Sequence, residues 1–201
     1  MNPQIAELLQ HGAPNAEAVD RFIRDHDFPL VEPGNVTFVF RGTADEVILR
    51  RWISGFNTAL PMQLLEGTDL WALTMDLPPG SRFEYKFEVV RGENRDLLLD
   101  TLNEVVAHDP FGANSVCQGY GYKRPAWTLP DPDARPGTLL QLPVKSAAFA
   151  SRRDIELYLP ARFKRSRSYP LLVVHDGSDY LRYAELKAVL DNLIHRLEIP
   201  A

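Results

Sequence analysis

The spacing of hydrophobic residues changes character along the chain. Up to residue 27, apolar residues recur at helical spacing in two stripes, and Asn15 is a suitable N-cap for the second stripe. From residue 35 to about 118 the apolar segments become short, β-branched and aromatic, and Pro and Gly residues separate them. This pattern predicts a helical start followed by an antiparallel β-sandwich of about seven strands.

The clearest strand pattern lies in residues 82–89, where charged and bulky side chains alternate. Alternate residues of a strand point to opposite faces of the sheet. The side chains expected inside are Phe83, Tyr85, Phe87 and Val89. Those expected outside are Arg82, Glu84, Lys86 and Glu88.

A second region of different character begins after a Pro-rich stretch at 125–138, which predicts a stiff, extended linker. Two strands are expected at 139–149 and 155–160, and an amphipathic helix from residue 183. Between them, Leu171 to Val174 form a continuous apolar run. Such a run is typical of a parallel strand that helices cover on both faces.

The turn Asp176-Gly177-Ser178 follows this predicted strand. A sharp turn with glycine leaves backbone N–H groups directed at a ligand, as an oxyanion hole requires. Gly177 and Ser178 are therefore candidate oxyanion-loop residues. The alternative is an ordinary strand-to-loop turn of an α/β domain.

Composition narrows the class of protein. With 45% hydrophobic and 24% charged residues in a chain of 201, the protein is globular, and no apolar segment approaches the roughly 20 residues that span a bilayer. A net charge of -5 argues against nucleic-acid binding. The single Cys117 excludes an internal disulfide, and the first residues do not resemble a secretory signal, so a cytoplasmic location is expected.

Charge is shared unevenly between the two regions. Residues 1–138 hold 12 Lys and Arg against 20 Asp and Glu, whereas residues 139–201 hold 10 against 7. The basic second region could attract an anionic substrate, or the two regions could simply have differently solvated surfaces. The same alternatives apply to the basic residues Arg162, Lys164, Arg165 and Arg167.

Metal and cofactor chemistry is not indicated. The five histidines, which are His11, His26, His108, His175 and His195, are widely spread along the chain. No group of Cys, His and Asp residues has the spacing of metal ligands. We therefore expect neither a metal nor a cofactor.

Several motifs together resemble a known family. Residues 36–42, 67–71, 77–89 and 109–116 are similar to the N-terminal immunoglobulin-like domain of enterochelin-esterase-type proteins, which is related to the early-set modules of glycogen-branching enzymes. Residues 153–160, 169–177 and 191–194 resemble the first strands and first helix of the attached esterase domain, in the esterase D branch of the α/β hydrolases.

The resemblance implies a division into three parts. Residues 1–124 would form a helical start and an immunoglobulin-like early-set domain, 125–138 the linker, and 139–201 the truncated beginning of an α/β-hydrolase domain. It also implies a Ser-His-Asp hydrolase of carboxylic esters, in the best-known members those of a ferric catecholate siderophore. Within that family, the residue after Asp-Gly supplies an oxyanion N–H, which in this sequence is Ser178.

The serine turn G-x-S-x-G of that family does not occur between residues 1 and 201. The chain alone is therefore expected to be inactive, and the remaining catalytic half or a second chain is an expected partner. Ser178 is too close in sequence to His175, and too far from His195, to form a triad of its own.

The alternative function is a non-catalytic binding module, for carbohydrate or for protein. Early-set relatives bind α-glucans on aromatic side chains, so Trp52, Trp71 and Trp127 are candidates for sugar contact. Core packing is the expected role of Trp71, because it lies within a predicted strand.

Overall fold

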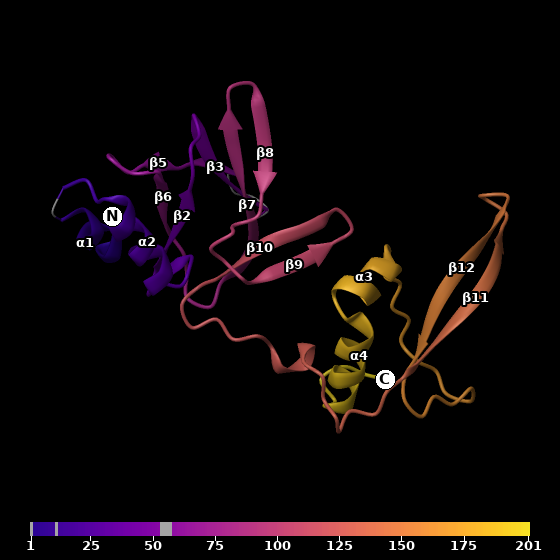
Figure 1. Ribbon diagram of the computed structural model, residues 1–201. Helices are drawn as coiled ribbons and strands as arrows, with labels where there is room; N and C mark the ends of the chain where they lie inside the picture. Colours follow the sequence, from indigo (N-terminus) through magenta and orange to yellow (C-terminus); the bar gives the residue numbers. More distant parts are fainter. Residues whose placement is uncertain (1, 11, 53–57) are drawn as a thin grey trace. The chain divides into compact units, whose positions relative to one another are not determined.

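The computed structural model describes residues 2–10, 12–52 and 58–201. The chain divides into two compact units, Met1–Lys123 and Arg124–Ala201. Each unit has its own secondary structure (Figure 1). Among the described residues, no helix is long and apolar enough to cross a membrane.

The first unit begins with the two expected helices, α1 (Pro3–Leu9) and α2 (Ala16–Asp25). Side chains cap both of them: the Asn2 Oδ1 accepts hydrogen bonds from the amides of Gln4 and Ile5, and the Asn15 Oδ1 accepts one from Ala18. These caps satisfy amides that have no acceptor within the helix. The predicted N-cap at Asn15 is confirmed.

The rest of the first unit is antiparallel β-structure. The strands are β1 (Leu30–Glu32), β2 (Asn35–Arg41), β3 (Glu46–Arg51), β4 (Ala59–Pro61), β5 (Gln63–Leu64), β6 (Leu70–Asp76), β7 (Arg82–Arg91), β8 (Asn94–Leu98), β9 (Val106–Asp109) and β10 (Gly112–Gln118). One sheet has the order β1-β2-β6-β5, and the other has β4-β3-β7-β10-β9, with β8 also paired to β7. The described residues of this unit form ten strands, where about seven were expected.

The two sheets share one hydrophobic core, which contains Phe38 of β2, Leu49 of β3 and Phe87 of β7. A second core lies on the other face of the first sheet, where Ile5 and Phe22 of the helices meet Val39 of β2. Figure 1 shows α1 and α2 beside this sheet. Strand β2 is therefore covered on both faces, which explains its nearly continuous apolar sequence.

Strand β7 confirms the predicted alternation with one exception. Its inward side chains, from Phe83 to Val89, are at most 6% exposed. Glu88 was expected outside, yet it is only 7% exposed. The side chains of Arg50 and Arg95 cover its carboxylate with hydrogen bonds, and these two bonds lower the pKa of Glu88. The alternating pattern within β7 cannot predict the burial of Glu88, because the side chains that cover it, Arg50 and Arg95, belong to the neighbouring strands β3 and β8.

A buried polar network fastens the segment between β8 and β9 to the core. The Asp100 carboxylate accepts hydrogen bonds from the Tyr85 hydroxyl (2.7 Å) and from the Leu102 amide (2.9 Å). Asn103 donates to the Tyr85 oxygen and to the Val116 carbonyl, each at 2.9 Å. Burial raises the pKa of Asp100 to about 6, although its two hydrogen bonds act in the opposite direction.

This raised pKa makes the stability of the first unit depend on pH. Between the ordinary pKa of 3.8 and about 6, the folded carboxyl keeps a proton that the unfolded one loses. The free energy of unfolding should therefore fall by on the order of 3 kcal/mol as pH rises through this window, and stay level above it. Urea titrations followed by tryptophan fluorescence at a series of pH values measure this dependence.

The matched variants for this test are Asp100→Asn, which should lack this component of the pH slope, and Asp96→Asn, which should retain it. Asp96 is a suitable control because its side chain is 56% exposed. Equal pH slopes in wild type and Asp100→Asn would show that Asp100 does not titrate in this window.

The second unit contains a hairpin and two helices. The elements are the 3₁₀-helix η1 (Ala126–Thr128), β11 (Thr138–Ser146), β12 (Ser151–Leu159), α3 (Gly177–Tyr183) and α4 (Leu186–His195). Both predicted strands are present and pair antiparallel with each other. The predicted helix from residue 183 begins only at Leu186, as α4, because Glu185 takes a left-handed conformation with φ 51° between α3 and α4.

The predicted buried strand at 171–174 is wrong. These residues have no regular secondary structure, and Leu171, Leu172 and Val173 are 85%, 65% and 68% exposed. A strand needs neighbours for its backbone hydrogen bonds. In the described part of this unit, the only ladder joins β11 to β12.

The Pro-rich stretch is also more structured than an extended linker. The Asn192 side chain of α4 donates hydrogen bonds to the carbonyls of Trp127 and Leu129, each at 2.8 Å. Arg196 donates to the Ala126 carbonyl at 3.3 Å and pairs with Asp131 at 3.3 Å. This stretch is therefore held against α4 within the second unit.

Candidate functional site

The two candidate oxyanion residues lie at the start of α3. Asp176 takes the left-handed conformation (φ 53°, ψ 36°), and the helix begins at Gly177. The Asp176 carbonyl accepts hydrogen bonds from the amides of Asp179 (2.9 Å) and Tyr180 (3.2 Å). The amides of Gly177 and Ser178 are the first two of the helix, and so have no acceptor within it. The left-handed residue of this turn is Asp176, whereas Gly177, the glycine expected to form the turn, is already the first residue of the helix.

The structure brings no base to Ser178. Ser178, His175 and His195 are all exposed. His175 precedes α3 and His195 ends α4, and no hydrogen bond in the described residues joins either histidine to the Ser178 hydroxyl. A hydroxyl nucleophile needs a base within hydrogen-bonding distance. The arrangement can therefore supply backbone donors, and it contains no assembled nucleophile.

Asp191 and Asn192 are two buried polar residues that hold this unit together, a role that the sequence analysis did not assign to them. The Asp191 Oδ1 accepts hydrogen bonds from the Gly137 amide and the Tyr158 hydroxyl, both at 2.7 Å. Its Oδ2 accepts one from Lys187 Nζ at 2.6 Å. Asn192, beside it, is 2% exposed and holds the stretch before β11. The Lys187 and Asp191 spacing, i and i+4, was the one available signal.

Gly137 fits closely at this junction. A Cβ atom there would lie 2.5 Å from the Tyr158 ring and 2.6 Å from the Leu159 carbonyl oxygen. Only glycine therefore lets the chain pass this close to β12 while donating its amide to Asp191.

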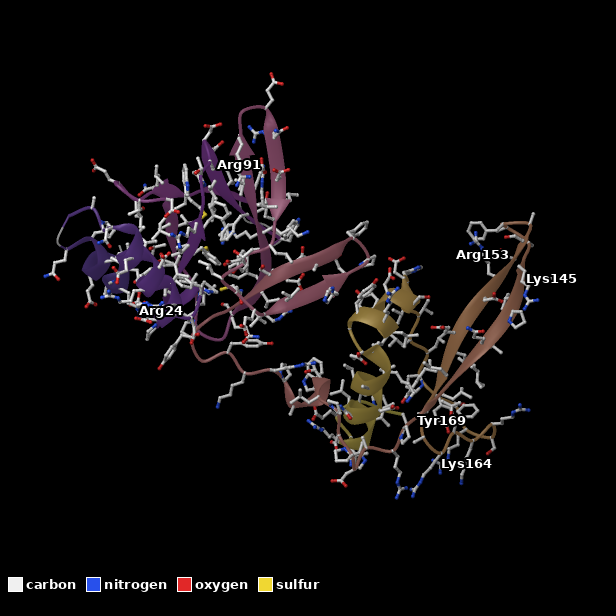
Figure 2. All side chains as sticks on the ribbon, in the orientation of Figure 1. Arg24, Arg91, Lys145, Arg153, Lys164 and Tyr169 are labelled. Carbon is white, nitrogen blue, oxygen red and sulfur yellow. The ribbon has the colours of Figure 1, made fainter. Side chains whose placement is uncertain are left out.

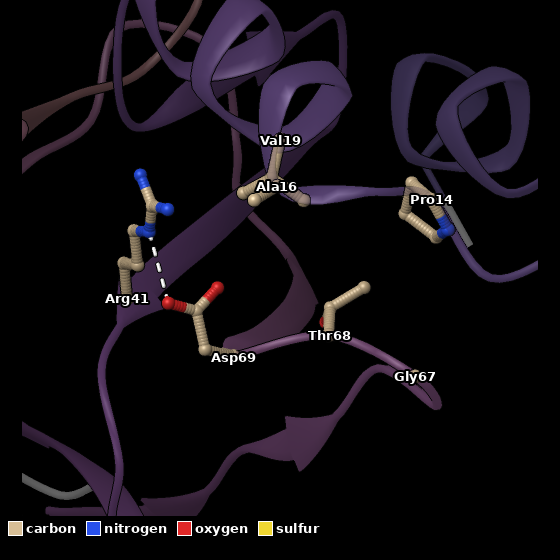
Figure 3. A pocket seen from close by; sticks show the side chains of 7 residues that line it. All are labelled: Pro14, Ala16, Val19, Arg41, Gly67, Thr68 and Asp69. Atoms are coloured by element: carbon tan, nitrogen blue, oxygen red, sulfur yellow. Dashed lines mark hydrogen bonds and ion pairs between the residues drawn. The ribbon is translucent and has the colours of Figure 1, made fainter.

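A cavity of about 200 Å³ lies in the first unit, between the start of α2 and the turn before β6. Figure 3 shows its lining, in which Arg41 faces Asp69. Arg41 pairs with Asp69 at 3.0 Å and with Asp20 at 2.5 Å, and these hydrogen bonds raise its pKa. Arg41 and Asp69, the two charged residues that line this cavity, form an ion pair with each other. Neither is therefore available as a free acid or base for catalysis.

The three candidate tryptophans differ in their surroundings. Trp71 is 7% exposed and donates its indole N–H to the Gly42 carbonyl, as expected for a core residue. Trp127 belongs to η1, and Trp52, the residue after β3, is 53% exposed. Across the described ranges, no three His, Cys, Asp or Glu side chains form a group that could hold a metal ion. His11 lies outside the described residues.

Comparison with known proteins identifies two similarities. Residues 146–201 match the family described as "Putative esterase". The fold is similar to that of ferric enterobactin esterase from Salmonella typhimurium (19% identity, TM-score 0.59), covering 83% of this chain and 51% of that one. No curated protein matches the sequence.

The enterobactin esterase of Shigella flexneri gives the same result. Its structure with enterobactin is 22% identical with a TM-score of 0.57, and its structure with 2,3-dihydroxy-N-benzoyl-serine is 22% identical with a TM-score of 0.55. The matches cover 83% of this chain and 50% and 49% of those chains, so this chain spans about half the length of these esterases. The expected resemblance is confirmed: the chain is enterochelin esterase-like in fold, and its residues 146–201 match an esterase family.

Proposed function

We propose that this chain is the N-terminal part of a cytoplasmic serine esterase that hydrolyses carboxylic esters of the ferric-siderophore type. The observation that carries this proposal is the esterase-family match at 146–201, within a fold similarity to enterobactin esterases that covers 83% of the chain. The buried free thiol of Cys117 is compatible with a reducing compartment.

The two units fit the two parts of such an enzyme. The first unit would be an immunoglobulin-like early-set domain preceded by helices, and its two antiparallel sheets around one core support this assignment. Residues 125–138 would connect it to the beginning of an α/β-hydrolase domain at 139–201. The hairpin β11–β12 and helices α3 and α4 would be the first elements of that domain.

Exposed apolar residues support a further partner for the second unit. Leu171, Leu172 and Val173 present apolar side chains to water, and burying each would contribute about 1.5–3 kcal/mol. The remaining catalytic half of the esterase would cover this surface and would bring the serine, the acid and the histidine. The Gly177 and Ser178 amides would then donate to the oxyanion of the ester.

Sequencing the coding DNA beyond codon 201 tests the assignment. An in-frame G-x-S-x-G turn, followed by acidic and histidine partners, is expected for the esterase. A stop codon directly after codon 201 would contradict it and would favour a binding module.

Activity gives an independent test. The chain of 201 residues should hydrolyse p-nitrophenyl acetate no faster than a mock preparation, because among the described residues no histidine is hydrogen-bonded to the Ser178 hydroxyl. The protein extended in its reading frame should show turnover. Activity of the short chain that disappears in Ser178→Ala would overturn this expectation.

A further inference from the structure

A basic loop connects β12 to the apolar segment at 171–173. We use this name for residues 160–169, which contain the exposed cations Arg162, Lys164, Arg165 and Arg167. In the part of the chain that the structure describes, none of these four forms an ion pair. Elsewhere in the same unit, Arg152, Lys187 and Arg196 each pair with an aspartate. The basic loop thus concentrates uncompensated positive charge.

The backbone of the basic loop is held in a defined conformation. The Phe163 amide bonds to the Pro160 carbonyl (3.1 Å), and the Arg167 amide bonds to the Lys164 carbonyl (3.0 Å). The rings of Phe163 and Tyr169 lie 4.9 Å apart, which closes the loop across its base. Figure 2 shows Lys164 and Tyr169 on this loop. A loop whose only role is to expose charged side chains to water would not require these internal contacts.

Tyr169 adds a donor to the basic loop. Its hydroxyl oxygen accepts a hydrogen bond from the Lys164 amide at 2.9 Å. Because the oxygen is used as an acceptor, the hydroxyl proton stays available for a further acceptor, such as an anionic oxygen. The cations and this hydroxyl proton together are the donor set that anionic oxygens require.

We propose that the basic loop binds the anionic tris-catecholate form of the siderophore substrate and raises its local concentration for the esterase. This inference rests on the proposed function for the identity of the anion. Arginine guanidinium groups bind paired oxygens through two parallel hydrogen bonds, and catecholates and carboxylates both offer such pairs. The net charge of -5 disfavours a nucleic acid as the ligand, because a long polyphosphate would extend beyond the basic loop, where acidic residues outnumber basic ones.

The binding experiment uses the chain of 201 residues and the gallium(III) complex of enterobactin, a diamagnetic trianion suited to NMR. Metal-free enterobactin, which is uncharged near neutral pH, is the ligand control. The complex should shift the amide signals of residues 162–169, and binding should weaken markedly between about 20 mM and 150 mM salt, as screening requires. Metal-free enterobactin should shift these signals far less.

Three variants test the role of the cations. Arg165→Gln with Arg167→Gln should weaken binding by about tenfold or more, because two charged donors are lost. Arg165→Lys with Arg167→Lys keeps the charge and should lose less. Arg21→Gln with Arg24→Gln, at exposed arginines of α2, should leave affinity unchanged. Signal shifts confined to other residues, or tighter binding of duplex DNA than of the complex, would overturn the inference.

The failures of this inference and of the proposed function can be told apart. If the complex binds the loop but the extended protein hydrolyses no ester, the esterase assignment fails and the anion site stands. If the extended protein hydrolyses the siderophore ester, and the double glutamine variant keeps the wild-type KM and salt dependence, the anion site fails and the esterase stands.

Discussion

Replacing Ser178 by proline should lower kcat of the proposed esterase by about 10²–10³-fold, the usual cost of removing one oxyanion donor. Proline has no backbone N–H, and the first turn of a helix tolerates it because the amides there have no intrahelical acceptor. Ser178 is the second residue of α3, so the substitution deletes the donor while the helix keeps its hydrogen bonds. The measurement is steady-state hydrolysis by the extended protein.

Ser178→Ala is the matched variant, because it keeps the amide and removes only the hydroxyl. It should be affected far less than Ser178→Pro. Circular dichroism of both variants would show whether α3 is retained. If Ser178→Ala abolishes activity as completely as Ser178→Pro, the hydroxyl and not the amide carries the function, and the oxyanion assignment fails.

The first unit shows which features sequence patterns predict well. In β7 the side chains alternate between core and surface, so a period of two residues places Phe83, Tyr85 and Phe87 correctly. The N-cap at Asn15 is a local interaction with an amide three residues away. Both features depend on neighbours close in sequence or on a repeating geometry, which the sequence contains directly.

The second unit shows what the sequence pattern could not decide. The apolar run from Leu171 indicates that burial would be favourable, but burial requires a partner surface, and the described residues provide none. Likewise, the polar pair Asp191 and Asn192 in α4 would ordinarily be placed on the solvent side of an amphipathic helix. Their burial follows from distant groups, Tyr158 and the carbonyl of Trp127, whose approach only the tertiary structure reveals.

In the candidate site, too, one feature could be predicted from the sequence and another could not. The turn before Gly177 was predictable from Asp-Gly, whose residues take unusual backbone conformations easily. The start of a helix directly at Gly177 was not, because the apolar stripe of the sequence begins only later, in α4. The helix start places the Gly177 and Ser178 amides where they have no internal acceptor, and this property makes them usable as donors.

Asp191→Ala should be the most damaging polar substitution in the second unit. It leaves the Gly137 amide, the Tyr158 hydroxyl and the Lys187 ammonium without their shared acceptor. Unsatisfied groups of this kind cost about 1–3 kcal/mol each when buried, and Lys187 is partly solvated, so a total on the order of 3 kcal/mol is expected. Hydrogen exchange at the α4 amides should show protection reduced by about a hundredfold.

Asp191→Asn separates the components of this effect. The asparagine oxygen can replace Oδ1 and keep the bonds from Gly137 and Tyr158, whereas its NH₂ group would face the Lys187 ammonium in place of Oδ2. A loss of only about 1 kcal/mol is therefore expected, and Asp154→Ala, at an aspartate whose side chain is 67% exposed, should cost less than about 0.5 kcal/mol. If Asp191→Asn and Asp191→Ala reduce protection equally, the ion pair with Lys187 provides the whole stabilisation. In that case the contacts to Gly137 and Tyr158 do not hold the hairpin to α4.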